Sequence, residues 1–548
     1  MGLLERLNSR YGRRGRKLRA TARQTFDWQE LRPGQQEAME HLLDGRDVLL
    51  VMPTGSGKSA VYQVPAQLRD GPTVVVSPLI ALQRDQVMSL LKADAGGAVA
   101  VNSTSSVDKG LEKVTAGEAE FVFLSPEQLA KPDVVDRLAK ARPSLIAVDE
   151  AHCVSSWGHD FRPDYLRLGK VIERLGHPPV VALTATAAPN VREEIVRFLG
   201  MRDPVQIVRG FDRPNIELKV RRFVREEDKR KALIEHAAAA EGLTLIYVAT
   251  RREAAEYAEA LAQAGRRAES YHAGMRAKER TRVHELFTAG ELDVVVATSA
   301  FGMGIDRPDV RHVLHAAPPE SPDAYYQEIG RAGRDGNPAH AVLFYRSEDL
   351  GLRRFFASGR VDAEALLRVA TLVAEHGGTV PVSELRSLLG IGSSQLTSLI
   401  NLLEQAEALT VSASGEVRAV RGGPTPKRAA ARAVELDEVR HRVDDSRIDM
   451  MRGYAETTGC RRRFLLEYFG QPYGRHCGNC DTCVATPRPA EAPAVDEGPF
   501  PLHSKVVHKA WGEGTVMSRE TDRITVAFDS VGYKTLALAA IGDVLTAQ

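Results

Sequence analysis

The stretch VMPTGSGKSAVYQ, Val51 to Gln63, follows the apolar run DVLLVM and decides how the chain folds. A glycine-rich turn between a buried strand and a helix is the setting of a P-loop, so it predicts a parallel α/β sheet around a nucleotide. The glycines let backbone amides surround phosphate oxygens, the lysine supplies catalytic charge to the β- and γ-phosphates, and the serine can ligate Mg²⁺. The residues predicted to bind ATP and Mg²⁺ here are Thr54, Gly55, Gly57, Lys58 and Ser59.

Two acidic residues close a later apolar run, LIAVDE. The carboxyl edge of a parallel sheet would place Asp149 beside the P-loop, where it can hold Mg²⁺ through water. Glu150 is then the predicted catalytic base for the attacking water. Cys153 follows closely and is expected to be a small packed residue and not a ligand.

A second polar segment, YYQEIGRAGRDG, lies far along the chain. Arginines three residues apart on a helix can reach a γ-phosphate from a second domain, as arginine fingers do. The catalytic residues predicted in this segment are Gln327, Arg331 and Arg334. Upstream, Gly302 and Gly304 permit a tight backbone near the nucleotide, and Asp306 is predicted to accept a hydrogen bond from a ribose hydroxyl.

The order of predicted elements indicates several folding units in 548 residues. Short β-branched runs alternate with helical segments twice, which predicts two tandem α/β domains, and later periodicity predicts three helices with a hairpin, a winged-helix-like module. Its predicted recognition helix is acidic, so DNA contact and a purely structural role both remain open. The expected units are 1–208 (N-terminal arm and first domain), 209–357 (second domain), 358–424 (winged-helix-like), 425–484 (helical zinc-binding), 485–500 (linker) and 501–548 (small β-barrel).

Four cysteines gather near the end of the helical region. Two CxxC steps and one distant thiolate suit a closed tetrahedral Zn²⁺ site, and an iron–sulfur cluster is the competing interpretation. The predicted ligands are Cys460, Cys477, Cys480 and Cys483. The neighbouring Arg461, Arg462 and Arg463 are open between DNA contact and a solvated helix start.

Composition excludes several classes of protein. No apolar run approaches the roughly 20 residues of a membrane span, and five cysteines in so long a chain favour a reducing compartment over a disulfide scaffold. The net charge is only +1, so any nucleic-acid surface must be a local groove. The basic run Arg10 to Arg19 is expected to be a solvated arm, with a specific DNA contact as the alternative. We therefore expect a cytoplasmic protein, associated with the nucleoid if bacterial.

The motifs PTGSGKS, DEAHCVSSWGHDFRPDY, LTATA, GFDRPNI and QEIGRAGRDG occur in an order that resembles the RecQ family of superfamily 2 DNA helicases. The resemblance implies two RecA-like domains, zinc at the cysteines, and adenine recognition by FDWQELRPGQ through Trp28, Arg32 and Gln35. It also implies that the aromatic-rich loop of DEAHCVSSWGHDFRPDY, which carries Trp157, Phe161 and Tyr165, senses single-stranded DNA. Because stacking on an aromatic ring tolerates any base, Trp157, Arg162 and Phe161 are the predicted DNA contacts, with inward packing as the alternative for the aromatic residues.

Two features depart from the family pattern. The winged-helix-like segment precedes the cysteines instead of following them, and no helical HRDC domain is recognisable. The last segment resembles the Tudor-like C-terminal module of UvrD and PcrA helicases, which implies RNA polymerase or another protein as a partner. Trp511 is open between an exposed anchor for that partner and a core residue of the barrel. The preceding linker favours a tether that takes no part in the motor.

These patterns predict an ATP-dependent DNA helicase. By resemblance it moves 3′ to 5′ on single-stranded DNA and unwinds forked or duplex DNA in repair and recombination. An RNA helicase and an ATP-gated DNA-binding or annealing protein are the alternatives. The expected cofactors are ATP, Mg²⁺ and Zn²⁺.

Overall fold

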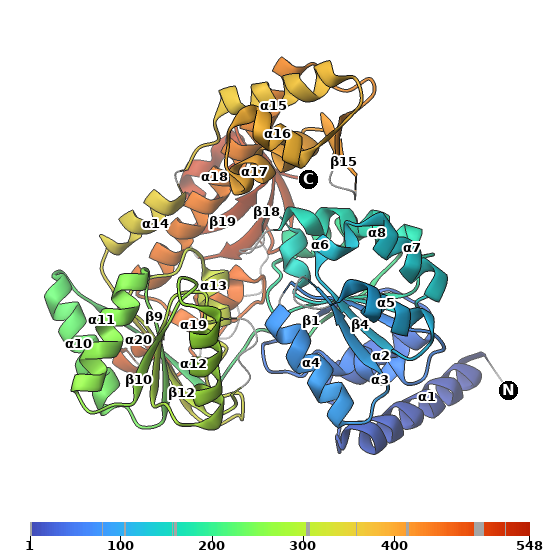
Figure 1. Ribbon diagram of the computed structural model, residues 1–548. Coiled ribbons are helices and arrows are strands. Elements are labelled where there is room, and N and C mark those ends of the chain that lie inside the picture. The colour runs from blue at the N-terminus through green and yellow to red at the C-terminus, as the bar shows by residue number, and fades with distance from the viewer. Residues whose placement is uncertain are drawn as a thin grey trace.

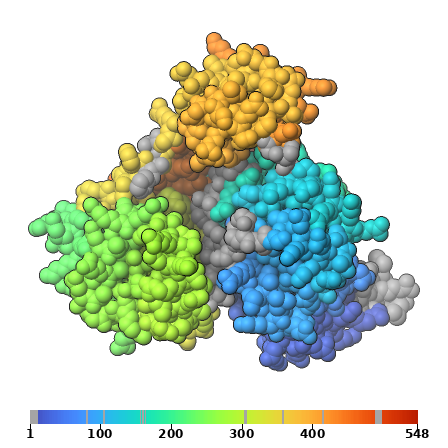
Figure 2. Space-filling model, in the orientation of Figure 1, coloured from blue at the N-terminus to red at the C-terminus, as the bar shows by residue number. Residues whose placement is uncertain are grey.

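The computed structural model describes most of the chain and arranges it as five packed units (Figure 1). The residues it describes are 3–78, 80–102, 106–155, 157, 162–302, 307–357, 359–412, 416–486, 498–520 and 522–548. In Figure 2 the first and second α/β domains stand side by side, with the winged-helix-like module above them. No helix within these ranges is long and apolar enough to cross a membrane.

The first domain is a seven-stranded parallel sheet of strand order β3-β4-β2-β5-β6-β1-β7. Its central strands are buried on both faces, as β-branched runs in parallel sheets are. The strands are β1 (Val48–Val51), β2 (Thr73–Val76), β3 (Ala98–Val101), β4 (Phe121–Leu124), β5 (Leu145–Val148), β6 (Val180–Thr184) and β7 (Val205–Val208).

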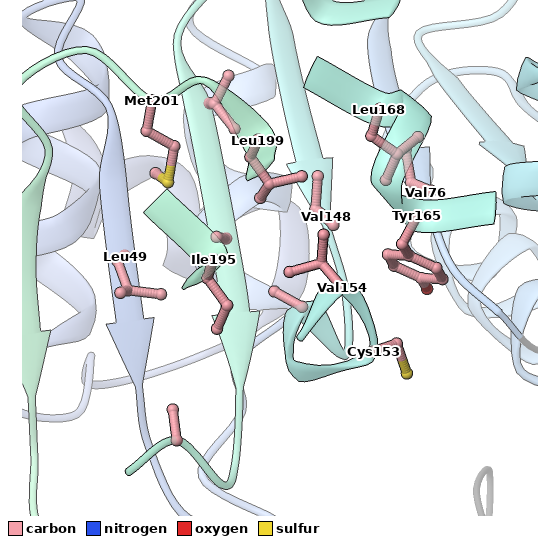
Figure 3. Packing of buried hydrophobic residues seen from close by; sticks show 14 of the residues in the cluster. Leu49, Val76, Val148, Cys153, Val154, Tyr165, Leu168, Ile195, Leu199 and Met201 are labelled. Carbon is pink, nitrogen blue, oxygen red and sulfur yellow. The ribbon is translucent and has the colours of Figure 1, made fainter. Parts of the chain in front are cut away.

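Helices cover both faces of this sheet (Figure 1). Figure 3 shows Leu49 of β1 and Val148 of β5 packed with Ile195 and Leu199 of α9, and Cys153 lies in the same core as expected. The helices are α1 (Leu3–Phe26), α2 (Gln35–Leu43), α3 (Ala60–Ala66), α4 (Ile80–Lys92), α5 (Val107–Thr115), α6 (Pro126–Leu129), α7 (Pro132–Ala141), η1 (Ala151–Val154), η2 (Pro163–Arg167), α8 (Leu168–Arg174) and α9 (Pro189–Leu199).

The second domain repeats the plan with a six-stranded parallel sheet of order β10-β11-β9-β12-β13-β8. Its strands are β8 (Ile216–Arg222), β9 (Leu243–Tyr247), β10 (Ala268–Tyr271), β11 (Val294–Ala297), β12 (Val310–His315) and β13 (Ala339–Tyr345). Its helices are α10 (Glu226–Ala239), α11 (Arg251–Gln263), α12 (Ala277–Ala289), α13 (Pro322–Ile329) and α14 (Asp349–Ala357). The predicted pair of RecA-like domains is confirmed.

The winged-helix-like module packs three helices on a small antiparallel sheet of order β14-β16-β15. Its elements are α15 (Ala363–His376), β14 (Thr379–Pro381), α16 (Val382–Leu389), α17 (Ser393–Gln405), β15 (Leu409–Val411) and β16 (Glu416–Ala419). The 31-residue helix α18 (Pro426–Glu456) then runs from this module to the second domain, which joins the two units (Figure 1).

The cysteine module consists of α19 (Arg461–Tyr468), α20 (Asp481–Ala485) and the loop between them. It attaches to the edge of the second sheet, because Cys480 forms a parallel bridge with Leu218 of β8. The backbone N–H of Leu218 donates to the carbonyl of Asn479. The module therefore covers part of the outer edge of β8, whose other edge pairs with β13.

The C-terminal unit is an antiparallel sheet of order β20-β19-β18-β17-β21 around its own small core, as the predicted β-barrel requires. Its elements are β17 (Lys505–His508), β18 (Gly512–Arg519), β19 (Arg523–Phe528), β20 (Gly532–Ala537), α21 (Leu538–Ile541), η3 (Gly542–Val544) and β21 (Leu545–Ala547). Most of the expected linker, 487–497, lies outside the described residues.

Candidate active site and DNA-binding loop

The P-loop follows β1 and opens α3, as the sequence predicted. Gly55 and Gly57 both have positive φ, 77° and 73°, the left-handed conformation that glycine adopts without a steric penalty. Lys58 Nζ lies 3.3 Å from the Met52 carbonyl oxygen. Burial lowers the pKa of Lys58, and the nearby carboxylates Glu150 and Asp149 oppose that shift.

The three residues expected to recognise adenine lie just before the P-loop. Gln35 Nε2 donates to the carbonyls of Ser56 (3.0 Å) and Gly57 (2.8 Å). Arg32 Nη1 donates to the Gly55 carbonyl at 2.5 Å, and Trp28 stacks on Phe26 with ring centroids 4.6 Å apart. Arg32 and Gln35 thus brace the phosphate loop; adenine contact by any of the three stays a prediction.

Asp149 and Glu150 follow β5 at the same sheet edge as the P-loop. Burial, with a smaller contribution from Glu150, raises the pKa of Asp149 to about 7, whereas Lys58 opposes the shift. Glu150 has φ 47°, and its Oε2 lies 3.3 Å from His152 Nδ1, which also contacts Thr184 Oγ1 at 3.0 Å. Carboxylate oxygens beside a lysine suit Mg²⁺ and phosphate together, so the donor set fits the predicted cofactors.

The helix α13 and the turn that follows it bring the second domain against the first domain and its P-loop. Gln327 Nε2 donates to Thr186 Oγ1 of the first domain at 3.4 Å. A Cβ added to Gly55 would lie 3.0 Å from Cγ of Arg334, so this arginine packs directly on the phosphate loop. Arg331 is 5% exposed, and its Nε atom has no hydrogen-bond partner among the described residues. An unsatisfied buried guanidinium donor at this place suits an anionic ligand.

Sequence reasoning missed the residue that holds these arginines in place. Arg213 donates to the carbonyls of Gly330 (3.1 Å) and Ala332 (2.7 Å), and so fixes the turn that follows α13. It lies in the quoted motif GFDRPNI, which could have drawn attention to it. Gly302 is near Arg331, since a Cβ there would lie 3.3 Å from its Nη2. Gly304 and Asp306 lie outside the described residues.

The four predicted cysteines converge in one cluster whose sulfur atoms all lie within 4.8 Å of one another. The sulfur atoms of Cys477 and Cys483 are 3.9 Å apart. Tetrahedral Zn²⁺ with Zn–S distances of about 2.3 Å places sulfur atoms about 3.8 Å apart, so the cluster fits zinc.

Comparisons with known proteins agree with this geometry. The chain matches the DEAD/DEAH box helicase family over residues 32–194, the helicase conserved C-terminal domain over 228–336, and the RecQ zinc-binding family over 427–484. A probable ATP-dependent DNA helicase RecS of Bacillus subtilis (strain 168) is 36% identical over 85% of this chain and 91% of its own length. The chain belongs to the RecQ family of ATP-dependent DNA helicases.

Other relatives are longer. The ATP-dependent DNA helicase RecQ of Pasteurella multocida is 34% identical over 84% of this chain, but only 61% of that protein is covered. A solved structure of Mycobacterium smegmatis helicase Lhr bound to ssDNA and AMP-PNP aligns with 78% of this chain and 62% of its own, at 21% identity and a TM-score of 0.51, a likeness of fold. The relatives' names favour a RecQ-type DNA helicase over the RNA-helicase and annealing-protein alternatives.

Trp157, in the aromatic-rich loop of this RecQ-family chain, differs from the expected exposed stacking platform. Trp157 is only 7% exposed, and its ring meets Tyr533 of the C-terminal barrel edge to face at 5.9 Å. Arg162 Nη1 donates to the Pro78 carbonyl at 3.3 Å, and Phe161 lies outside the described residues. In this conformation Trp157 packs inward, which is the alternative to an exposed DNA contact.

Two other groups of residues that could contact DNA form ion pairs within the protein instead. Arg461 and Arg462 are 3% and 4% exposed, and they pair with Asp481 and Asp212 at 2.5 Å. Arg462 joins the zinc module to the second domain, because it also donates to the Ile216 carbonyl of β8, whereas Arg461 joins α19 to α20 and to the Tyr454 carbonyl of α18. For these two residues this corrects the interpretation of a DNA-facing or solvated start; Arg463 is partly exposed and pairs with Glu467. On the predicted recognition helix α17, Glu404 pairs with Arg167 of the first domain.

The C-terminal barrel is not a free tether, which corrects the expectation of a unit apart from the motor. Its strand β20 packs on α18, and Lys505 Nζ pairs with Glu193 Oε2 of α9 at 2.9 Å. Trp511 is partly buried and stacks on His508 with ring centroids 4.0 Å apart, as a core residue of the barrel does. No local sequence pattern predicts this interface, because its residues come from distant parts of the chain.

Proposed function

We propose that this RecQ-family helicase couples ATP hydrolysis between its two α/β domains to 3′-to-5′ movement along single-stranded DNA, and so separates forked and duplex DNA in repair and recombination. The observation that carries the proposal is the contact of α13 and the turn after it with the first domain. Arg334 packs on Gly55, and Gln327 reaches Thr186 across the domain boundary. A ligand held by both domains can make their separation depend on the state of the nucleotide.

Each charged group in the cleft has a chemical role in this proposal. Lys58 neutralises the γ-phosphate, Glu150 accepts a proton from the attacking water, and Arg331 and Arg334 stabilise charge that develops on the transferred phosphoryl group. When bound, Mg²⁺ would offset phosphate charge, and Ser59 and Asp149 would hold it. The contact between Glu150 and His152 orients the carboxylate in the cleft.

Forked duplexes with either a 3′ or a 5′ single-stranded tail test the proposal. Unwinding should require ATP and the 3′ tail, and Glu150→Gln should still bind ATP while it hydrolyses slowly, because it keeps the shape of the base and loses its basicity. ATP hydrolysis without strand separation, or a requirement for the 5′ tail, would contradict the proposal. An RNA fork of the same sequence should be unwound poorly.

The DNA contact in this proposal is the aromatic-rich loop, with Trp157, Arg162 and Phe161. The loop follows the acidic motif directly, so a base bound there can influence the cleft. Stacking of one base on an aromatic ring contributes about 1 to 3 kcal/mol and tolerates any sequence. Trp157→Ala should therefore weaken the stimulation of ATPase by single-stranded DNA more than it weakens nucleotide binding.

A protein partner of the barrel and a site of action at the nucleoid in the cytoplasm also belong to this proposal. The resemblance to the UvrD and PcrA modules makes RNA polymerase the candidate partner. β20 packs on α18, whereas β21 forms the opposite edge of the sheet. A chain truncated before the barrel should lose co-purification with the polymerase; equal capture with and without the barrel would exclude the barrel as its docking site.

A further inference from the structure

Tyr533 of β20 lies between two aromatic rings of the motor. Its ring is stacked on Tyr468 of α19 at 5.0 Å and meets Trp157 of the aromatic-rich loop at 5.9 Å and 87°. All three residues belong to the same buried cluster as the core of the first domain. One residue of the appended barrel therefore touches both the zinc module and the predicted DNA sensor.

The docking is specified by backbone geometry and polar contacts. The backbone N–H of Tyr533 donates to Ser446 Oγ of α18 at 3.0 Å. Gly532 has φ 75°, and a Cβ added there would lie 2.1 Å from Ser446 Oγ, so only glycine allows this close approach. Arg442 Nε donates to the Ser530 carbonyl at 2.9 Å. The turn before β20 is therefore shaped to fit α18.

Helix α9 holds the barrel and the aromatic-rich loop through adjacent residues. Glu193 pairs with Lys505 of the barrel, and Glu194 Oε2 accepts from Ser155 Oγ at 2.6 Å. Ser155 Oγ in turn accepts from the backbone N–H of Trp157 at 3.0 Å. The docked barrel thus contacts the loop and its anchoring helix together.

We propose that Tyr533 is a positioning residue for Trp157, and that the docked barrel holds the Trp157 side chain in a closed position from which single-stranded DNA must release it. This inference rests on the proposed DNA contact at Trp157. A ring that is 7% exposed has no face available to a base, so stacking requires Tyr533 to move away. The apparent affinity for DNA is then the intrinsic affinity multiplied by the fraction of molecules in the open state.

The concentration of oligo-dT that gives half-maximal ATPase stimulation measures this closed state in the full chain. Tyr533→Ala should lower that concentration roughly three- to tenfold, the range given by the loss of one aromatic contact. Tyr533→Phe keeps the ring and loses only the hydroxyl, which is hydrogen-bonded to Tyr468, so its half-saturating concentration should lie closer to that of the parent protein than to that of Tyr533→Ala. An unchanged or raised half-saturating concentration in the folded Tyr533→Ala variant would overturn the inference.

A surface variant tests the same idea without disturbing the aromatic core. Lys505 and Glu193 are 47% and 60% exposed, so Lys505→Glu should fold and should only loosen the docking. We expect roughly a twofold lower half-saturating concentration, and the double change Lys505→Glu with Glu193→Lys should restore the parent value. Lack of any effect of Lys505→Glu, or lack of rescue, would count against the inference if Tyr533→Ala fails to fold.

Trp157→Ala in two backgrounds separates this inference from the proposed function. If Trp157 binds DNA and Tyr533 closes it off, the change should weaken DNA stimulation more in the Tyr533→Ala background than in the parent chain. If Trp157→Ala weakens stimulation equally in both, the positioning role fails and the DNA contact stands. If it has no effect in either background, the DNA contact itself fails and the inference fails with it.

Discussion

The nucleotide cleft and the interface beneath the C-terminal barrel both join distant parts of the chain, but they are built from different contacts. In the cleft, the charged groups of Lys58, Asp149 and Arg334 lie close together, and a buried donor of the neighbouring Arg331 lacks a partner among the described residues. Beneath the barrel, aromatic rings pack closely and the backbone of Tyr533 is hydrogen-bonded. The first contact is made of charged groups that an anionic ligand can bridge, whereas the second is a packed interface with its backbone donor bonded.

This difference predicts opposite responses to ligands. ATP should draw the two α/β domains together, because its phosphates can bind Lys58 of the first domain and Arg331 and Arg334 of the second at the same time. Single-stranded DNA should instead separate the barrel from the loop, because the same ring cannot contact Tyr533 and a base. Residues of the cleft should therefore control the rate of hydrolysis, and residues of the barrel interface should control its dependence on DNA.

The largest expected effect belongs to the cleft. Lys58→Ala should reduce ATP hydrolysis at least about a hundredfold, because the γ-phosphate loses its charged partner while the fold is kept. Turnover measured with and without oligo-dT checks this prediction. A folded variant with wild-type turnover would show that the P-loop lysine is not catalytic.

Removal of a zinc ligand should have the next largest effect. Cys480→Ser should lose the metal and several kcal/mol of unfolding free energy, since the binding energy of a structural site is folding energy. Cys153→Ser is the matched control, because this buried cysteine lies outside the cluster and its change should leave zinc content intact. Metal analysis that finds iron and sulfide in the parent chain would contradict the zinc assignment.

Two glycines of the barrel separate docking from backbone strain. Gly532 and Gly512 have φ 75° and 74°, but only Gly532 faces a close neighbour, Ser446. Alanine at Gly512 should cost about 1 kcal/mol through strain alone, and alanine at Gly532 roughly 2 kcal/mol or more, with tighter oligo-dT binding. Equal costs in urea unfolding, with no change in DNA binding, would indicate that the close approach to α18 does not hold the barrel.

Acidification should weaken the barrel interface slightly. Burial, with a further contribution from Arg192, lowers the pKa of His503 below 6.5 in the docked state. The docked barrel therefore binds fewer protons than the released barrel, and docking is lost as the pH falls below 6.5 towards the lowered pKa. We expect roughly a twofold lower half-saturating oligo-dT concentration near pH 5.5 than near pH 7.5, and His503→Asn should remove this difference.

The residues of the cleft could be predicted from the sequence because they belong to short local motifs. GSGKS after an apolar strand fixes the positions of Lys58 and Ser59, and parallel pairing then carries Asp149 to the same sheet edge. The cysteine spacing predicted the zinc cluster for the same reason. The burial of Trp157 was not predictable, because Tyr533 stands in an ordinary alternating strand and its contact with the loop depends on tertiary packing.

Hydrogen exchange at the Tyr533 amide tests the central claim most directly, because this N–H donates to Ser446 only while the barrel is docked. The full chain is compared with and without saturating oligo-dT, in the presence of a non-hydrolysable ATP analogue. The closed-loop account predicts faster exchange at the start of β20, and at Trp157, when DNA is bound. Equal or slower exchange at Tyr533 with DNA bound would show that the barrel stays docked on the loop, and would contradict the account.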